Sequence, residues 1–316
     1  MKICKAILLV PVLLALSCGP KKAQQPLTRD FPKAEIPMMV AEPSERILWL
    51  GVHFWDKFTD TLTLYHCDSL TVNGVKSDDL EKQMGVFSSL LAEIPLEEGS
   101  KDMLRFMDRL EAFQKAHPES NMLQKMAEVT AKYFYDPNSP VRSEDLYLPF
   151  VSRLASSSLI DPIYRMGYNW DEKMCRMNRT GTPAADFTFI DTNGKSRTLY
   201  GIKADYTLLI FGNPDCHACK ELVENISFLD DIRSLMDSGR LKVADIYIDE
   251  DIALWKEKMR EYPQDWINGY DPTFTIRTDV LYNVRALPSM YLLDKDKTVL
   301  LKDAVPDAVL DYLLNL

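Results

Sequence analysis

The sequence is short of basic residues, long apolar runs and cysteine, and each shortage excludes a class of protein. Its 37 lysines and arginines face 47 aspartates and glutamates, which gives a net charge of −10. An acidic chain repels phosphate backbones, so the composition argues against a nucleic-acid partner. Only residues 7–16 form an apolar run that concerns a membrane, which excludes a polytopic membrane protein.

The cysteine count and the length favour an ordinary folded protein with more than one domain. Six cysteines among 316 residues are too few for a disulfide-stapled miniprotein, so their spacing matters more than their number. The chain is 46% hydrophobic and 27% charged, which is typical of soluble globular proteins. At roughly 150 residues per domain, the length predicts about two domains.

The N-terminus has the pattern of an export signal. Residues 1–17 carry Lys2 and Lys5 before the apolar run, and a small-residue cleavage context follows it. The stretch Leu14-Ala15-Leu16-Ser17-Cys18 resembles the lipobox of bacterial lipoproteins. This resemblance implies that Cys18 is acylated and anchors the mature protein to a membrane. An ordinary cleavable signal with an incidental cysteine is the alternative.

Residues 18–38 contain proline, lysine, glutamine and alanine without hydrophobic periodicity, which predicts a lipidated Cys18 followed by a flexible tether. The tether lacks the acidic run that often accompanies surface export in the lipoproteins of Bacteroidota. We therefore expect a lipid-anchored protein of the bacterial cell envelope, held at the outer membrane and facing the periplasm.

Residues 39–177 have apolar residues at helical spacing, which predicts a small all-α domain. Pro95, Pro118 and residues 136–140 interrupt the periodicity where loops are needed. N-caps are expected at Ser44, Ser77, Ser100 and Ser143. The stripes are Ile47, Leu50, Phe54 and Phe58; Leu80, Met84, Phe87, Leu91 and Ile94; Met103, Phe106, Met107, Leu110 and Phe113; and Leu123, Met126, Ala127, Thr130 and Phe134.

Residues 178–316 change to short runs rich in β-branched and aromatic residues, separated by helical stretches, which predicts an α/β domain. Asp191-Thr192-Asn193-Gly194 is expected to be a hairpin turn. Strands are predicted at 187–190, 207–211, 243–248, 290–293 and 298–301, and helices at 219–236 and 252–262. Because α/β sheets present their sites where strands end, the chemistry is expected after the strand at 207–211.

At that strand end stands the motif Cys216-His217-Ala218-Cys219. Two intervening residues on a first helical turn bring two sulfurs close enough to form a small disulfide ring. The helix N-terminus stabilises a thiolate, so Cys216 is expected to be the attacking nucleophile. Cys219, deeper on the helix, is expected to resolve the mixed disulfide.

Residues 181–189, the CxxC motif and residues 287–294 together resemble the thioredoxin-fold thiol-disulfide oxidoreductases of the TlpA/ResA type. The resemblance implies a C-terminal thioredoxin fold, with a central mixed sheet flanked by helices, over residues 178–316. It also implies that Pro288 is the family's cis-proline and that Leu287 and Pro288 bind a substrate peptide in β fashion. The helical half resembles a domain of uncharacterised function that is paired with thioredoxin-like domains in Bacteroidota lipoproteins.

The sequence departs from that family around the motif. Asp215 stands where a tryptophan usually precedes the first cysteine, and a carboxylate opposes a thiolate at Cys216. His217, when protonated, has the opposite effect, so we treat Asp215, His217 and Ala218 as redox-tuning residues. The buried acid of thioredoxins falls on Ile210 here. The glutamate of the TlpA/ResA type falls on Leu222, and its neighbour Glu221 points elsewhere on the helix.

Several plainer interpretations stand beside the redox one. A structural disulfide or inert thiols would make the second half a non-catalytic binding scaffold. Zinc needs a second Cys or His pair at ligand spacing, which the four histidines do not provide, so no metal is expected. Cys67 and Cys175 are best explained as free, buried thiols, although a disulfide between them is conceivable. His53 is interpreted as a packed or surface imidazole.

The sequence therefore predicts an exported thiol-disulfide oxidoreductase that reduces protein disulfides. It needs no cofactor besides the redox-active Cys216–Cys219 pair. Its predicted partners are protein disulfide clients and, as the resemblance implies, a membrane thiol-transfer electron donor. An oxidase or isomerase that uses the same two cysteines would differ from a reductase only in its reduction potential. The alternative that is not an enzyme is a non-catalytic scaffold lipoprotein.

Overall fold

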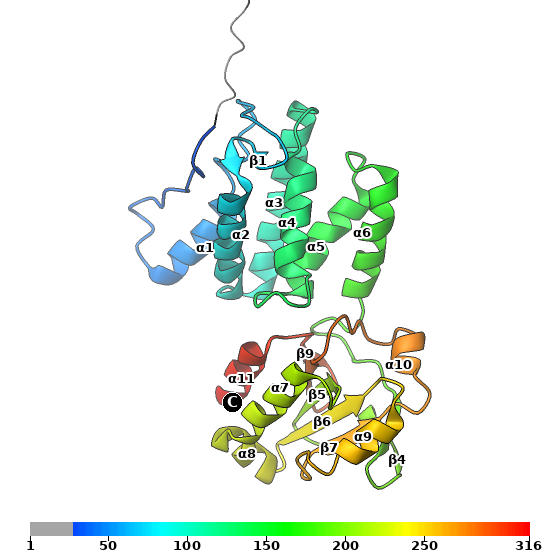
Figure 1. The fold of residues 1–316 in the computed structure, drawn as a ribbon. Coiled ribbons are helices and arrows are strands. Elements are labelled where there is room, and N and C mark those ends of the chain that lie inside the picture. Colours follow the sequence, from blue (N-terminus) through cyan, green and yellow to red (C-terminus); the bar gives the residue numbers. More distant parts are fainter. Residues whose placement is uncertain (1–27) are drawn as a thin grey trace, which may run out of the picture.

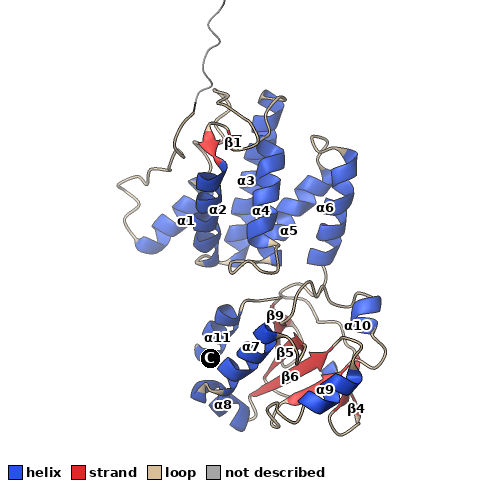
Figure 2. Ribbon diagram, viewed as in Figure 1, coloured by secondary structure: helices blue, strands red, loops and turns tan. Residues whose placement is uncertain are grey.

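The computed structural model describes residues 28–316, so the predicted signal and the predicted acylation site Cys18 lie outside the described residues. Within the described part, helices dominate first and nearly all strands follow (Figure 2). A helical domain and a sheet domain are joined by the segment that follows helix α6, Pro162–Cys175 (Figure 1). None of the helices in residues 28–316 combines the length and the apolar content that a membrane span needs.

The helical domain packs around one apolar core. Its helices are α1 (Pro43–His53), α2 (Ser77–Ala92), α3 (Leu96–Ala116), α4 (Met122–Phe134), α5 (Glu144–Ser156) and α6. The apolar stripe predicted on α3 is buried along its whole length. A hairpin of β1 (Thr71–Val72) and β2 (Val75–Lys76) adds one feature to the predicted all-α domain. Its turn is Asn73-Gly74, a pair that readily adopts the positive φ angles found there.

Of the four predicted N-caps, only Ser143 caps a helix. Its hydroxyl accepts a hydrogen bond from the Leu146 N–H at 3.3 Å, at the start of α5. Ser44 and Ser77 lie in the first turns of α1 and α2 instead, and Ser100 lies inside α3. The prediction for Ser100 is wrong because α3 begins directly after Pro95, a residue that is well tolerated at a helix start.

The sheet of the second domain has the strand order β4-β3-β7-β6-β5-β8-β9. The central strands β5, β6 and β7 are parallel, whereas β3 and β8 join them antiparallel. The strands are β3 (Thr188–Asp191), β4 (Ser196–Thr198), β5 (Tyr206–Gly212), β6 (Leu241–Tyr247), β7 (Ile267–Tyr270), β8 (Ser289–Asp294) and β9 (Val299–Leu301). A mixed sheet with flanking helices after a helical domain confirms the predicted fold class.

Alternation along the strands divides the sheet domain into two apolar layers. One layer contains Leu208 and Ile210 of β5, and we call this side of the sheet the α7 face. Its helices are α7 (His217–Ser227), α8 (Asp230–Asp237), α9 (Ile252–Lys258) and α11 (Pro306–Leu314). The other layer contains Leu209 and Phe211 and packs against η1 (Leu199–Gly201) and α10 (Thr275–Thr278).

The predicted hairpin at residues 191–194 is confirmed, because β3 and β4 pair antiparallel across it. Two predicted helices are shorter than expected. The helix at 219–236 breaks into α7 and α8 at Leu229, where the backbone is extended. Periodicity did not reveal this break because both helices bury apolar residues in the same layer. Helix α9 ends at Lys258 rather than residue 262.

Candidate functional site

Cys216 is the N-cap residue of α7, at the end of the loop that leaves β5. Its N–H donates to the Asn213 carbonyl at 3.0 Å, and its own carbonyl accepts the Lys220 N–H at 3.1 Å. Cys216 is half-buried, whereas Cys219, one turn further along the helix, is 2% exposed. The more accessible sulfur therefore belongs to the residue expected to attack.

The Cys219 thiol lies close enough to Cys216 for the first cysteine to raise the pKa of the second. The Cys219 sulfur also accepts a hydrogen bond from the Asn213 N–H at 3.5 Å. Burial raises the pKa of the Cys219 thiol; the Asn213 N–H opposes this shift, and the neighbouring Cys216 and Asp245 add to it. Cys219 therefore needs a base nearby before it can attack a disulfide.

Leu287 and Pro288, the predicted substrate-binding residues, lie beside Cys216. The Cys216 thiol donates to the Leu287 carbonyl at 3.7 Å, and the Leu287–Pro288 peptide bond is cis. Both residues are half-buried. The sequence separates this segment from Cys216 by 71 positions, and the pairing of β5 with β8 brings the two together.

The loop before Cys216 is held from two sides. The Asn213 side chain accepts the Asp215 N–H at 2.8 Å and donates to the Asp249 carboxylate at 2.7 Å. Asp249 in turn pairs with Arg277 of α10. No local sequence pattern predicts this support, because Asp249 belongs to an acidic run that resembles solvated surface charge. The Asn213 side chain thus ties the CxxC loop to the loop that follows β6.

The three predicted tuning residues are on the surface. The side chain of His217 is 88% exposed, and its Nε2 lies 3.3 Å from Glu221. Asp215 lies 3.9 Å from the Lys220 ammonium. Ala218 is exposed. Asp215 therefore has a cationic partner, and His217 has a carboxylate partner, other than the sulfur.

Asp245 is a buried carboxyl beneath the motif that the sequence analysis missed. It lies on β6, directly beside Ile210 of β5, and strand alternation points both side chains to the α7 face. Asp245 is 7% exposed, and its Oδ1 has no hydrogen-bond partner in residues 28–316. The acid expected at Ile210 is thus found one strand away, on the same face of the sheet.

The surroundings of Asp245 favour its protonated form. Burial raises the pKa of Asp245 from 3.8 to about 7. A Cβ atom added at Gly212 would lie 2.6 Å from Asp245 Oδ1, so a glycine at this position leaves room for the carboxyl. An aspartate as the one charged residue of the predicted strand 243–248 was the available sequence signal. What the sequence could not give was the register that aligns it with Ile210.

Leu222 and Glu221 do not replace this acid. Leu222 is buried in the apolar layer of the α7 face, and Glu221 pairs with His217 at the surface. The described residues hold no cluster of His, Cys, Asp and Glu that could bind a metal ion. Cys67 and Cys175 are free thiols, and Cys175 is buried as expected. The expectation of a buried thiol is wrong for Cys67, which is half-buried because it lies in the loop before β1. His53 pairs with Asp56 at 2.8 Å.

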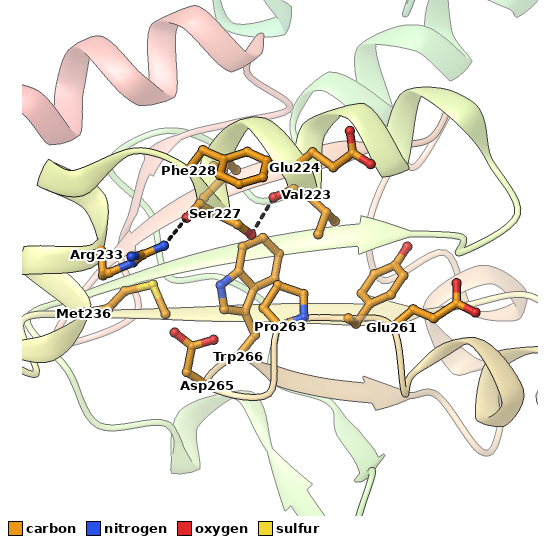
Figure 3. A pocket seen from close by; sticks show the side chains of 12 residues that line it. Val223, Glu224, Ser227, Phe228, Arg233, Met236, Glu261, Pro263, Asp265 and Trp266 are labelled. Atoms are coloured by element: carbon orange, nitrogen blue, oxygen red, sulfur yellow. Dashed lines mark hydrogen bonds between the residues drawn. The ribbon is translucent and has the colours of Figure 1, made fainter.

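A pocket of about 350 Å³ lies between helices α7 and α8 and the segment 261–266 (Figure 3). Phe228 and Trp266 line it, and Arg233 lines one side of it and donates to the Ser227 carbonyl at 2.9 Å. Neither sulfur of the CxxC motif lines this pocket. Tyr262 connects the two regions: it lines the pocket, and burial raises the pKa of Tyr262, with Asp245 and Cys219 adding to the shift.

Comparisons with known proteins agree with this architecture. A family model described as a domain of unknown function, DUF5106, matches residues 16–178. The crystal structure of a thioredoxin-like protein from Bacteroides caccae is 34% identical, with a TM-score of 0.77 over 90% of this chain and 98% of that one. No curated protein matches the chain.

Two further solved structures match less than half of this chain. The C-terminal domain of an uncharacterized protein from Bacteroides fragilis is 44% identical over 43% of this chain and 98% of that chain, with a TM-score of 0.42. The thioredoxin domain of a thiol-disulfide oxidoreductase from Bacteroides vulgatus is 21% identical over 42% of this chain and 97% of that chain, with a TM-score of 0.37.

Proposed function

Because the chain belongs to the thioredoxin-like proteins and to the family defined by the DUF5106 domain, we propose that it reduces protein disulfides through Cys216 and Cys219. The single observation that carries this proposal is the meeting of three groups. The half-buried Cys216, the buried Cys219 and the Leu287 carbonyl lie together at the end of β5. An accessible sulfur beside a resolving one is the arrangement that thiol-disulfide exchange requires.

The exchange takes place in two steps. The Cys216 thiolate attacks one sulfur of the client disulfide, forms a mixed disulfide and releases the other client sulfur as a thiolate. Cys219 then loses its proton and attacks the Cys216 sulfur, which releases the second client thiolate and leaves the Cys216–Cys219 disulfide. Two electrons pass from the CxxC pair to the client.

Asp245 is the base that we propose for the second step. Its pKa of about 7 lets it hold or release a proton near neutrality, and it raises the pKa of the adjacent Cys219. A base whose pKa is close to the working pH is effective in proton transfer. Asp245 therefore accepts the Cys219 proton as that sulfur attacks.

We also propose the setting that the sequence predicts. Acyl chains on Cys18 anchor the protein to the outer membrane, and the domains face the periplasm. A membrane thiol-transfer donor reduces the Cys216–Cys219 disulfide after each turnover. These elements are supported by the N-terminal sequence pattern and by the family resemblance.

Trapping tests the function directly. The variant Cys219→Ser cannot resolve the mixed disulfide, so disulfide-linked adducts to Cys216 are expected to accumulate in a periplasmic extract. The double variant Cys216→Ala/Cys219→Ser should trap none, and Cys67→Ser should behave as the unmodified protein. The absence of adducts with Cys219→Ser, together with ordinary iodoacetamide reactivity of Cys216, would favour the scaffold alternative.

A further inference from the structure

A buried cluster of charges joins the two domains beside the site. Glu144, at the start of α5, is 1% exposed in its side chain. Its two carboxylate oxygens lie 2.9 Å from Arg285 and 2.7 Å from Lys302, both of which belong to the sheet domain. Asn283 also donates to Glu144 at 2.9 Å. The Glu144 carboxylate of the helical domain thus faces two cations and one hydrogen-bond donor of the sheet domain.

Arg285 connects this cluster to the substrate segment. It precedes Leu287 by two residues, and its guanidinium lies 4.1 Å from the centre of the Tyr135 ring in the helical domain. The same nitrogen that contacts Glu144 lies 3.0 Å from Asp303. Ionic and stacking contacts together fix a planar guanidinium more closely than a single ion pair would.

Asp303 holds the other end of the segment. The Ser289 hydroxyl, directly after Pro288, donates to Asp303 at 2.7 Å. Arg142 of the helical domain donates to the Asp303 carbonyl at 3.0 Å and to the Ala304 carbonyl at 3.3 Å. The segment 285–289 is therefore clamped at both ends, and Leu287, whose carbonyl faces the Cys216 sulfur at 3.7 Å, lies at its middle.

A gain in folding free energy does not explain why these charged side chains are buried. Desolvation makes a buried ion pair a weak source of folding free energy, whereas its directional contacts restrict geometry. Asp303 contacts both ends of the segment whose Leu287 carbonyl accepts the Cys216 thiol, and Glu144 contacts one end through Arg285. Fixing that segment is a task that an apolar contact between the domains would perform less well.

We propose that the helical domain positions the substrate-binding segment of the sheet domain, with Arg285 as the positioning residue and Glu144 as its anchor. This inference rests on the proposed reduction of protein disulfides and gives the helical domain a role in it. A client peptide pairs with the backbone at Leu287, so a displaced segment weakens client binding. The chemistry at the two sulfurs continues without the clamp.

The test compares three variants of the full chain in mild detergent. Glu144→Gln removes the anchoring charge, and Asn283→Ala is a milder variant that removes only one neutral donor. Glu111→Gln is the matched control, because Glu111 is a buried carboxylate of the same domain that binds Arg153 and Ser157, at 2.7 and 2.6 Å, without reaching the sheet domain. Insulin serves as the protein disulfide, and a small aromatic disulfide serves as a substrate that needs no peptide pairing.

We expect Glu144→Gln to raise the KM for insulin about tenfold and Asn283→Ala about threefold, with kcat within twofold of the unmodified protein. Reduction of the aromatic disulfide should remain unchanged in all variants. Glu111→Gln should lower thermal stability without moving either KM. An unchanged insulin KM in folded Glu144→Gln and Asn283→Ala, or an equal rise in Glu111→Gln, would overturn the inference.

Hydrogen exchange separates this inference from the proposed function. Amides of residues 284–290 should exchange at least about fivefold faster in Glu144→Gln than in Glu111→Gln, whether or not the protein turns over. If the unmodified protein reduces neither substrate, the proposed function fails while the exchange data still test the clamp. Equal exchange in the two variants would refute the clamp even in an active enzyme.

Discussion

Two buried carboxyls in this molecule have opposite surroundings. Glu144, at the domain interface, has the cations Lys302 and Arg285 within 2.9 Å. Asp245, beneath the CxxC motif, forms no ion pair within residues 28–316, and its Oδ1 has no hydrogen-bond partner there. Burial raises the pKa of both carboxyls, but cations oppose the shift only at Glu144. A buried carboxylate that is paired with cations can hold two domains together. A buried carboxyl without a cation beside it is free to exchange a proton.

Removal of a cation from Glu144 should have the largest effect on stability. Lys302→Met leaves a buried carboxylate with one fewer partner and should lower the free energy of unfolding by about 3–5 kcal/mol. Lys297→Met is the matched control, since the Lys297 ammonium is buried without a hydrogen-bond partner and its removal should not lower the free energy of unfolding. Urea unfolding of both variants measures the difference, and equal losses would contradict the comparison.

Asp245→Asn should stabilise the reduced protein, increasingly so as the pH rises. The pKa of Asp245 is about 7 in the folded state against an ordinary value of 3.8. Between these values the folded state keeps a proton that the unfolded chain has lost, so Asp245 costs stability as the pH rises. The advantage of the variant over the unmodified protein should therefore grow by about 2–3 kcal/mol between pH 5 and pH 8.

Urea unfolding of the reduced protein at the two pH values measures this difference. A constant difference between variant and unmodified protein would mean that Asp245 is not a titrating buried acid.

The same substitution should slow catalysis at one step. Without the Asp245 base, Cys219 should resolve the mixed disulfide about a hundredfold more slowly, while alkylation of Cys216 keeps its rate. Asp215→Asn changes an exposed carboxylate beside the motif and should alter resolution by less than about threefold. Quenched-flow measurement of the mixed disulfide gives the rate directly, and equal rates in the two variants would exclude Asp245 as the base.

A smaller effect is expected from filling the space beside Asp245. Gly212→Ala introduces a Cβ atom 2.6 Å from Asp245 Oδ1 and should cost about 1–3 kcal/mol. The cost should shrink when Asp245→Ala is added, which a double-mutant cycle measures. Gly167→Ala, with nothing within 4 Å of its new Cβ atom, is expected to gain about 0.5–1 kcal/mol. A penalty at Gly212 that persists without Asp245 would mean that another neighbour causes it.

The sequence predicted the parts of this molecule that depend on local pattern. Helical and alternating periodicity separated the helical half from the sheet half, and the spacing of Cys216 and Cys219 at a strand end located the candidate site. The segment around Pro288 was found by family resemblance. No local sequence pattern in this segment indicates that it contacts a sulfur 71 positions away. The helical periodicity of apolar residues continues across the break between α7 and α8, because both helices bury apolar residues in the same layer. The sequence therefore predicted one helix where the structure has two.

The two buried carboxyls escaped prediction because their roles depend on tertiary neighbours. Asp245 matters through the register that aligns β6 with β5 and puts it beside Ile210. Glu144 and Asn283 are 139 positions apart in the sequence, so no short-range pattern links them. A single charge within the predicted strand 243–248 was visible in the sequence, but whether this charge is paired could be learned only from the fold.

The reduction potential of the Cys216–Cys219 pair tests the proposed chemistry most directly. The full chain is equilibrated in defined thiol/disulfide buffers, the thiols are alkylated, and the peptide that carries each cysteine is quantified by mass spectrometry. We expect a reversible two-electron transition of this pair at about −270 mV, the poise of a reductase. A pair that stays oxidised or reduced across the whole range would contradict redox turnover, and a transition near −120 mV would make the protein an oxidant instead.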